Sequence, residues 1–229
     1  MPENIEKDRI CIDGKNSHCI KNVLRLNKGD KIEIFDGKGN KYNCVLQDLN
    51  TARITSKEFS LAKETAYNVI LAQAIPNKPA KMDFVIEKAT EFGVDTIMPV
   101  ASERSVIKTD RGQRWRKIAS EASRQCGRPK VPEIKYILSV EEAVAKTADS
   151  GLKLFACIHS DTDTLQKALK TAQSPKTITV FIGPEGDFIE EEIKVAKEKD
   201  FKLISLGERV LRTETAGLYV LSILDYVFG

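Results

Sequence analysis

The chain has 229 residues, 41% of them hydrophobic, and a formal net charge of +3. This length allows one large domain or two small ones, each big enough to bury a core. The sequence has neither a signal peptide nor an apolar run of about 18 residues, which argues against a membrane-spanning class. We therefore expect an ordinary soluble globular protein with no membrane partner.

Cysteines are scattered through the chain, and none belongs to a C-x-x-C motif; they are Cys11, Cys19, Cys44, Cys126 and Cys157. An odd number without paired spacing argues against a disulfide framework and against a zinc site. We therefore expect buried, reduced thiols, no bound metal and a cytoplasmic location.

The first part of the chain, residues 1–66, has the pattern of a small β domain. Four short runs are expected to be strands, at residues 32–35, 42–46, 51–55 and 58–61. The Gly- and Asn-containing segment 36–40 is typical of a hairpin turn, and residues 18–26 are expected to form a helix. Closely spaced strands with turn signals favour a barrel or a sandwich.

From residue 67 to residue 229, strands alternate with longer helices, which is the pattern of an α/β sheet. About six strands are expected, at residues 69–74, 96–100, 134–137, 154–158, 178–182 and 203–206. Helices are expected at residues 82–92 and at residues 111–125. A third is expected between the strands at 178–182 and 203–206, and a last one begins at Thr213. Trp115, Ile118 and Ala122 share one helix face, so we expect Trp115 to lie in the core.

Two of these strands end in loops that contain glycine and open a helix. Gly183 and Gly186 follow the strand at 178–182, and Gly207 follows the strand at 203–206. Glycine lets a ligand approach the backbone closely because it has no Cβ atom, and such loops at the carboxyl edge of a sheet form a cradle. The common nucleotide-binding glycine fingerprints are missing, so the spacing alone is equally compatible with two ordinary turns.

Residues 182–186 and 206–216 together resemble the signature of the RsmE family. These proteins are bacterial methyltransferases of the SPOUT class that place a methyl group on N3 of a uridine in 16S ribosomal RNA. Residues 18–30, 88–94, 103–106 and 114–125 also resemble family segments, in the expected order. The resemblance therefore covers nearly the whole chain.

Two positions depart from the family pattern. Asp187 stands where the family usually has a second glycine, and Ile189 stands where it has a Ser or Thr helix cap. Aspartate tolerates left-handed backbone angles better than most residues, so the turn can accept it, although its carboxylate could instead crowd the ligand. Asp187 and Glu190 also have the spacing of a capping box.

The resemblance implies a SPOUT α/β knot, with a deep trefoil knot at the C-terminal end, preceded by a small PUA-like β-barrel. It divides the chain into a PUA-like RNA-binding domain at residues 1–66 and a SPOUT methyltransferase domain at residues 67–229. It also implies a homodimer. The helix that begins at Thr213 is apolar most of the way round, so two of its faces require burial.

The resemblance further implies that S-adenosyl-L-methionine is the cofactor and that backbone groups of the two glycine loops hold it. The residues concerned are Ile182, Gly183, Pro184, Glu185, Gly186, Leu206, Gly207, Val210, Leu211 and Arg212.

Methylation at N3 of uracil requires the loss of a proton, so a base or a cation that stabilises charge on O2 and O4 would help. Glu185 is the acid nearest to the cofactor loop. Arg212 and Arg104 are the cations best placed to stabilise charge or hold a phosphate. Glu214 is a further candidate acid, although a carboxylate in the first turn of a helix is often only a dipole partner. The target uridine must be unpaired or flipped out, because N3 lies on its Watson–Crick edge.

Positive charge is concentrated in one segment. Residues 101–135 contain ten Lys or Arg and four Asp or Glu, whereas residues 136–229 contain eleven and fifteen. Such an excess fits an anionic polymer, which the resemblance implies is ribosomal RNA, although a solvated helix with internal ion pairs has the same composition. The residues expected to bind RNA are Arg9, His18, Lys21, Arg25, Arg114 and Arg128, of which His18 and Arg25 could equally be internal.

Two other functions remain open from the sequence alone. A non-catalytic RNA-binding protein that acts in folding or assembly is supported only by Asp187 and Ile189, and the intact segment 211–215 argues against it. A SPOUT methyltransferase that acts on another RNA is disfavoured by the N-terminal β domain and by residues 103–106.

Overall fold

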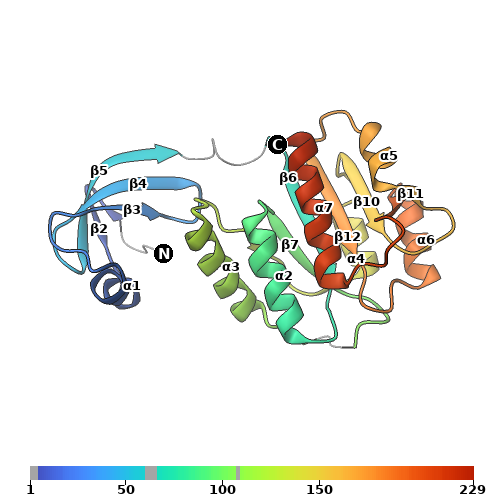
Figure 1. The fold of residues 1–229 in the computed structure, drawn as a ribbon, viewed down its shortest axis with the longest axis horizontal. Coiled ribbons are helices and arrows are strands. Elements are labelled where there is room, and N and C mark those ends of the chain that lie inside the picture. The colour runs from blue at the N-terminus through green and yellow to red at the C-terminus, as the bar shows by residue number, and fades with distance from the viewer. Residues whose placement is uncertain (1–4, 60–65, 107–108) are drawn as a thin grey trace. The chain divides into compact units, whose positions relative to one another are not determined.

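The computed structural model describes residues 5–59, 66–106 and 109–229. The chain divides into two compact units, of which the first comprises Met1–Glu64 with Ser123–Val131 and the second Thr65–Ala122 with Pro132–Gly229. Each unit has its own sheet and its own core (Figure 1).

The first unit is built on a five-stranded antiparallel sheet with the order β1-β2-β5-β4-β3. Its strands are β1 (Ile5–Glu6), β2 (Arg9–Cys11), β3 (Lys31–Phe35), β4 (Asn40–Leu46) and β5 (Thr51–Phe59). The prediction of two strands at 51–55 and 58–61 is wrong, because β5 pairs continuously with β4 across a register shift at Asn43/Cys44. Residues 60 and 61 of that prediction lie outside the described residues.

The hairpin turn at residues 36–40 is confirmed, since Phe35 pairs with Lys41 across it. Asp36 stabilises the turn by accepting hydrogen bonds from the N–H groups of Lys38 and Asn40, at 2.8 and 3.0 Å. The same turn bonds to a distant segment, because Gly39 N–H donates to Pro129 O at 3.1 Å. This contact explains why residues 123–131 belong to the first unit.

The helix of the first unit begins earlier than predicted. The structure has α1 (Gly14–Cys19), followed by a π-helical turn, η1 (Ile20–Leu24). Asp13 starts α1, because its Oδ1 accepts a hydrogen bond of 2.8 Å from Asn16 N–H. Arg25 ends the segment in a left-handed conformation with φ 55°.

The second unit contains an eight-stranded parallel sheet with the order β11-β13-β10-β12-β6-β7-β8, and β9 also pairs with β7. Its strands are β6 (Asn68–Ala74), β7 (Thr96–Ala101), β8 (Glu133–Ile134), β9 (Leu138–Ser139), β10 (Leu152–Ala156), β11 (Asp163–Thr164), β12 (Thr177–Ile182) and β13 (Lys202–Ser205). The expected count of about six was too low. β11 was missed and the predicted strand at 134–137 is two separate strands, because two-residue strands leave no periodic signal.

Helices cover this sheet. They are α2 (Pro79–Glu91), α3 (Gly112–Cys126), α4 (Val140–Lys146), α5 (Leu165–Lys170), α6 (Glu190–Glu198) and α7 (Thr213–Phe228). α2 and α7 lie side by side, and α7 packs on β12, whereas α4 packs on α6 and β7 (Figure 1). α2 begins at Pro79 rather than at Met82, because proline suits the first turn of a helix.

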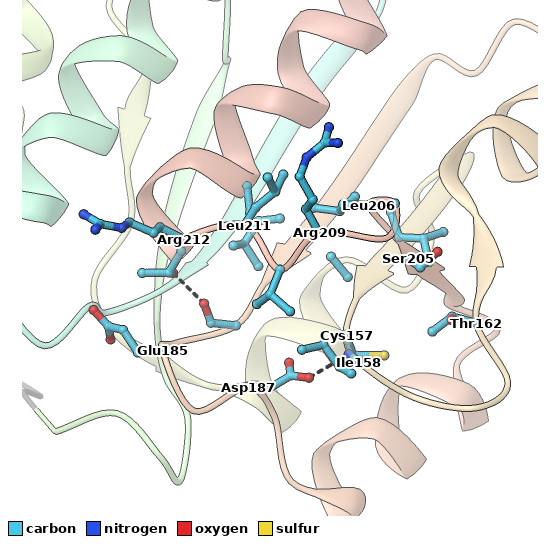
Figure 2. A pocket seen from close by; sticks show the side chains of 18 of the residues that line it. Cys157, Ile158, Thr162, Glu185, Asp187, Ser205, Leu206, Arg209, Leu211 and Arg212 are labelled. Atoms are coloured by element: carbon cyan, nitrogen blue, oxygen red, sulfur yellow. Dashed lines mark hydrogen bonds between the residues drawn. The ribbon is translucent and has the colours of Figure 1, made fainter.

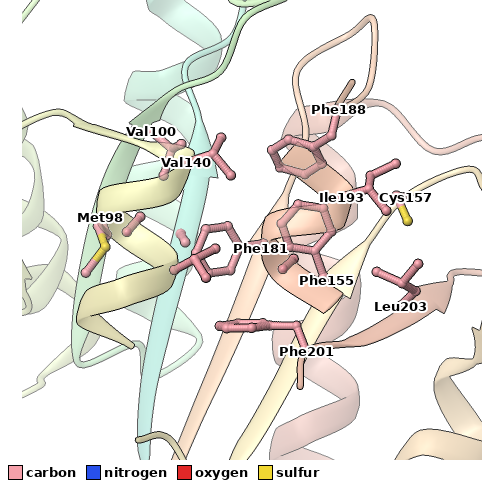
Figure 3. Packing of buried hydrophobic residues seen from close by; sticks show 14 of the residues in the cluster. Met98, Val100, Val140, Phe155, Cys157, Phe181, Phe188, Ile193, Phe201 and Leu203 are labelled. Atoms are coloured by element: carbon pink, nitrogen blue, oxygen red, sulfur yellow. The ribbon is translucent and has the colours of Figure 1, made fainter. Parts of the chain in front are cut away.

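Phenylalanines form the centre of the core of the second unit, as Figure 3 shows. Phe155 of β10 lies 5.3 Å from Phe181 of β12 and 4.3 Å from Phe188, measured between ring centroids, and Phe201 contacts both strand residues edge-on. Trp115 is only 1% exposed, which confirms its predicted place in a core. The phenylalanine cluster lies beneath the ends of β10 and β12 and supports the loops that follow them.

All five cysteines are free, but only Cys44 and Cys157 are buried as expected. Cys11 and Cys126 are exposed, and Cys11 faces away from the core because Ile10 beside it on β2 points inward. Among the residues that the structure describes, none of the helices combines the length and the apolar character needed to cross a membrane.

Phe181→Ala should lower the free energy of unfolding by about 3–5 kcal/mol, because it removes a fully buried ring and leaves a cavity. Val106→Ala, at a residue that is 81% exposed, should change it by less than about 0.5 kcal/mol. Urea unfolding followed by circular dichroism measures both. Equal effects of the two substitutions would contradict the packing described here.

Candidate active site

A cavity of about 510 Å³ opens where β10, β12 and β13 end. These strands are neighbours in the sheet, in the order β13-β10-β12, so the loops that follow them meet at one edge (Figure 2). The volume lies within the range of small-ligand sites. The cavity is therefore the cradle predicted at the carboxyl edge of the sheet. Three strands contribute loops to it, whereas two were predicted.

The third loop is the part that sequence analysis missed. β10 lies between the two strands that carry the glycine loops, and its last residue, Ala156, lines the cavity together with residues 157–159 of the loop that follows. The lining residues outside the predicted set are Lys81, Ala156, Cys157, Ile158, His159, Thr162, Asp187, Ile204, Ser205, Glu208, Arg209, Thr213 and Ala216. The apolar run before Cys157 marked a strand, but its place in the sheet order has no signature in the sequence.

The residues predicted to bind the cofactor line this cavity, with the exception of Gly186. Gly207 has φ +110°, and a Cβ atom at this position would meet no atom within 4 Å, so its backbone is open to a ligand. Gly183 is required for a different reason. A Cβ atom there would lie 3.0 Å from Asp187 Oδ1 and 3.3 Å from the ring of Phe188.

The first residue of the loop after β12 is held by the start of α7. Thr213 Oγ1 donates a hydrogen bond of 2.6 Å to Gly183 O, and it accepts one of 3.0 Å from Gln73 Nε2. Thr213 and Gln73 are both buried. This chain of bonds joins β6, β12 and α7 at the edge of the cavity.

Glu185 is held by the segment that begins α2. Lys81 Nζ lies 2.6 Å from Glu185 Oε1, and Asn77 N–H donates to the same carboxylate at 3.1 Å. Lys81 Nζ also lies 3.3 Å from Glu214 Oε2, which is ion-pair distance without hydrogen-bond alignment. Partial burial raises the pKa of Glu185, but Lys81 and the backbone N–H groups outweigh it, and the net pKa is lowered. Glu185 is therefore a stable carboxylate.

Gly186 is held from a third direction. Arg104 Nη1 donates a hydrogen bond of 2.6 Å to Gly186 O, and a Cβ atom on Gly186 would lie 3.2 Å from Arg104 Cδ. Arg104 itself is not among the residues that line the cavity. Its guanidinium fixes the loop rather than facing the cradle.

The predicted capping box of Asp187 and Glu190 is wrong. Ile189 is the N-cap of α6, and its N–H donates to Glu192 Oε2 at 3.0 Å. Glu192 is buried, and its other oxygen accepts a bond of 2.9 Å from Glu103 N–H. Glu192 at the third helical position therefore forms one half of a capping box, whereas the apolar Ile189 side chain accepts no bond from the first-turn N–H groups.

Asp187 adopts the left-handed conformation that the sequence analysis allowed, with φ 60°. Its Oδ2 accepts a hydrogen bond of 2.7 Å from Ile158 N–H, so it joins the loop after β12 to the loop after β10 (Figure 2). Cys157, next to this bond, has its pKa raised to about 12 by burial and then by the charge of Asp187. Its thiol is therefore a poor nucleophile.

The cations predicted to contact RNA differ in their surroundings. Arg9, His18, Lys21 and Arg25 are exposed, so the alternative that His18 and Arg25 are internal is wrong. Arg114 binds Asp83 Oδ2 through Nε and Nη2, at 2.9 and 2.7 Å. Arg128 is half-buried. Residues 107 and 108 of the basic segment lie outside the described residues.

Comparison with known proteins gives the class first. A family described as "RNA methyltransferase domain" matches residues 63–225, and one described as "RNA methyltransferase PUA domain" matches residues 12–59. The cradle at the sheet edge thus lies inside an RNA methyltransferase domain, and the prediction of a PUA-like N-terminal domain is confirmed.

Individual relatives name the family. The ribosomal RNA small subunit methyltransferase E of Bacillus subtilis is 32% identical, over 96% of this chain and 91% of the relative, and that of Synechocystis is also 32% identical, over 94% and 72%. The crystal structure of the Neisseria gonorrhoeae enzyme, bound to S-adenosyl methionine, aligns with a TM-score of 0.87 at 31% identity, over 100% of this chain and 96% of that one. The chain belongs to the ribosomal RNA small subunit methyltransferase E family, RsmE.

Thr213→Val should lower the free energy of unfolding by about 1–3 kcal/mol, because the buried Gln73 Nε2 keeps only its bond to Ala74 O and Gly183 O loses the hydroxyl donor. It should also weaken S-adenosylmethionine binding, since the loop loses its anchor. Thr215→Val, at an exposed threonine two residues further along the same helix, is the matched control. Urea unfolding and titration calorimetry test this, and a Thr213 variant that matches the control in both would contradict it.

Proposed function

We propose that the chain transfers the methyl group of S-adenosylmethionine to N3 of a uridine in 16S ribosomal RNA. The observation that carries the proposal is the cradle formed by the loops after β10, β12 and β13, within a chain of the RsmE family. Family membership makes the chain an S-adenosylmethionine-dependent ribosomal RNA methyltransferase. The choice of uridine and of its N3 atom follows from the resemblance of residues 182–186 and 206–216 to the family signature.

The shape and chemistry of the cradle fit this cofactor. Gly207 is open to a ligand, and the cavity volume of about 510 Å³ suits a nucleoside with an amino-acid tail. Backbone groups of Ile182–Glu185, Leu206–Gly207 and Val210–Arg212 would hold the adenosine part. S-adenosylmethionine supplies an activated methyl group on a sulfonium, so the protein has mainly to orient the methyl donor and the uracil and to exclude water.

Among the residues proposed for the chemical step, Arg212 is the best placed to stabilise negative charge on the uracil oxygens. It is exposed, it lines the cavity, and its side chain makes no hydrogen bond within the described part of the chain. Glu185 lines the cavity too, but its lowered pKa makes it a weak proton acceptor. Arg104 acts on the reaction through the position of Gly186.

We assign RNA binding to the N-terminal domain, with its boundary near residue 66, together with the basic segment 101–135. The exposed cations Arg9, His18, Lys21 and Arg25 of the first unit support this, since phosphate contacts need accessible positive charge. The protein would act in the cytoplasm, where ribosomal RNA is made and assembled in bacteria.

We also propose a homodimer and a trefoil knot in the C-terminal half, as the resemblance implies. The dimer is supported by apolar side chains on α7 that the second unit does not cover, since Tyr219, Tyr226 and Val227 are 44%, 90% and 46% exposed. A second copy would bury them.

Small ribosomal subunits from a host that lacks this enzyme, incubated with the protein and methyl-labelled S-adenosylmethionine, should acquire label in 3-methyluridine. Digestion of the RNA to nucleosides and mass spectrometry measure this. The double variant Arg212→Ala with Gly207→Trp should transfer no label, because it loses the cation and fills the cradle. Label in another nucleoside would contradict the assignment of N3 and leave the methyltransferase class intact.

Arg9→Ala combined with Lys21→Ala should weaken RNA binding by about tenfold and reduce the slope of log K against log salt by about one to two, because two phosphate contacts are lost. Arg114 is unsuitable for this test, since its replacement would also expose Asp83. Lys170→Ala, at an exposed lysine of α5, is the control. Filter binding at several salt concentrations measures both the affinity and the slope. An unchanged slope would show that Arg9 and Lys21 face solvent and do not contact RNA.

A further inference from the structure

Asp187 occupies a conformation that costs free energy. Its φ of 60° is left-handed, a region that disfavours residues with a Cβ atom relative to glycine. The side chain of Asp187 does not cap α6, because the N-cap of this helix is Ile189 and the carboxylate of Asp187 bonds to Ile158 N–H instead. A side chain kept in a strained conformation at the wall of a binding cavity suggests a role in binding.

The carboxylate of Asp187 spans two of the three loops of the cradle. Oδ2 accepts the 2.7 Å bond from Ile158 N–H in the loop after β10. Oδ1 lies against the backbone of Gly183, 3.0 Å from the position that a Cβ atom would take there. Figure 2 shows the group at the cavity wall beside Ile158, and Asp187 is among the lining residues.

The carboxylate of Asp187 has no ion-pair partner among the residues that the structure describes. Four basic residues line the cavity, and none of them forms an ion pair with Asp187 within the described parts of the chain; they are Lys81, His159, Arg209 and Arg212. Lys81 is bound to Glu185 and Glu214 instead. Asp187 is half-buried, and its charge acts on the neighbouring Cys157, whose pKa is raised first by burial and then by this carboxylate.

An uncompensated carboxylate in a partly buried cavity favours a cationic ligand. S-adenosylmethionine has two positive groups, the sulfonium and the α-ammonium. We propose that the carboxylate of Asp187 binds one of these cationic groups and thereby contributes to the affinity of this chain for its methyl donor. The inference rests on the proposed function, in which the cradle holds S-adenosylmethionine.

Asp187→Asn tests the charge alone. Asparagine also tolerates the left-handed conformation, and its oxygen can still accept the bond from Ile158 N–H. We expect the Kd of S-adenosylmethionine, measured by titration calorimetry, to rise about tenfold, as for one partly buried charge-assisted contact. Asp200→Asn is the matched control, since Asp200 has φ 58° as well but is exposed and does not line the cavity.

Two further probes identify the cationic group. S-adenosylhomocysteine keeps the ammonium and lacks the sulfonium, and 5′-methylthioadenosine has neither. Weaker binding of S-adenosylmethionine alone would support contact with the sulfonium, in which case Asp187 also favours release of the demethylated product. Weaker binding of S-adenosylmethionine and S-adenosylhomocysteine, with unchanged 5′-methylthioadenosine, would support contact with the ammonium.

An equal loss for all three probes would show that Asp187 acts only on loop geometry, and no loss for any would show that its charge is irrelevant; either result overturns the inference. The melting temperature of Asp187→Asn checks the fold, and Asp187→Gly, which relieves the backbone, serves as a second variant if asparagine unfolds the loop. A failure of the proposed function is distinguishable, because the unsubstituted protein would then not bind S-adenosylmethionine at all.

Discussion

The hydrogen bond from Thr213 Oγ1 to Gly183 O is the contact on which the site depends most. It joins the first residue of α7 to the first residue after β12, and the same hydroxyl is fixed by Gln73 from β6. Thr213 is buried, so water cannot replace its hydroxyl if the two hydrogen bonds break. Breaking them would leave buried polar groups of Gly183 and Gln73 without this partner, which costs the free energy of their desolvation. The start of the loop is therefore set by the strand and helix frame, and a bound ligand need not order it.

The rest of the loop is fixed by charged groups rather than by apolar contacts. Lys81 binds Glu185 and Arg104 binds Gly186 O, so cations from two different segments hold successive residues. Phe188, two residues after Gly186, packs on Phe155 and returns the loop to the core. A glycine-rich turn has little side-chain area of its own to bury, so its position must come from such outside contacts. Binding a cofactor to a loop already held in this way avoids part of the entropy cost of ordering it.

Sequence reasoning succeeded where an element has a long apolar run or a periodic face, as for β6, β12 and the helix that buries Trp115. It placed two of the three loops of the cradle but missed the one after β10, because the order of strands in a sheet depends on long-range packing. The ion pair of Lys81 with Glu185 was missed for the same reason, since 104 residues separate the two. The cap formed by Glu192 was overlooked because the rule was applied from Asp187, two residues before the true N-cap.

The distribution of bonds among the charged residues bears on how N3 of uracil would lose its proton in the proposed reaction. Glu185 is bound by Lys81 and by backbone N–H groups, and these contacts lower its pKa, so it binds a proton less readily than a free carboxylate. Arg104 is engaged by Gly186 O, whereas Arg212 has no bonded partner in the described part of the chain and lines the cavity. A site with a weak base and an available guanidinium is better suited to stabilise the uracil anion than to remove its proton directly. Such a site would take the proton to solvent and hold the negative charge on the oxygens next to N3 until the methyl group arrives.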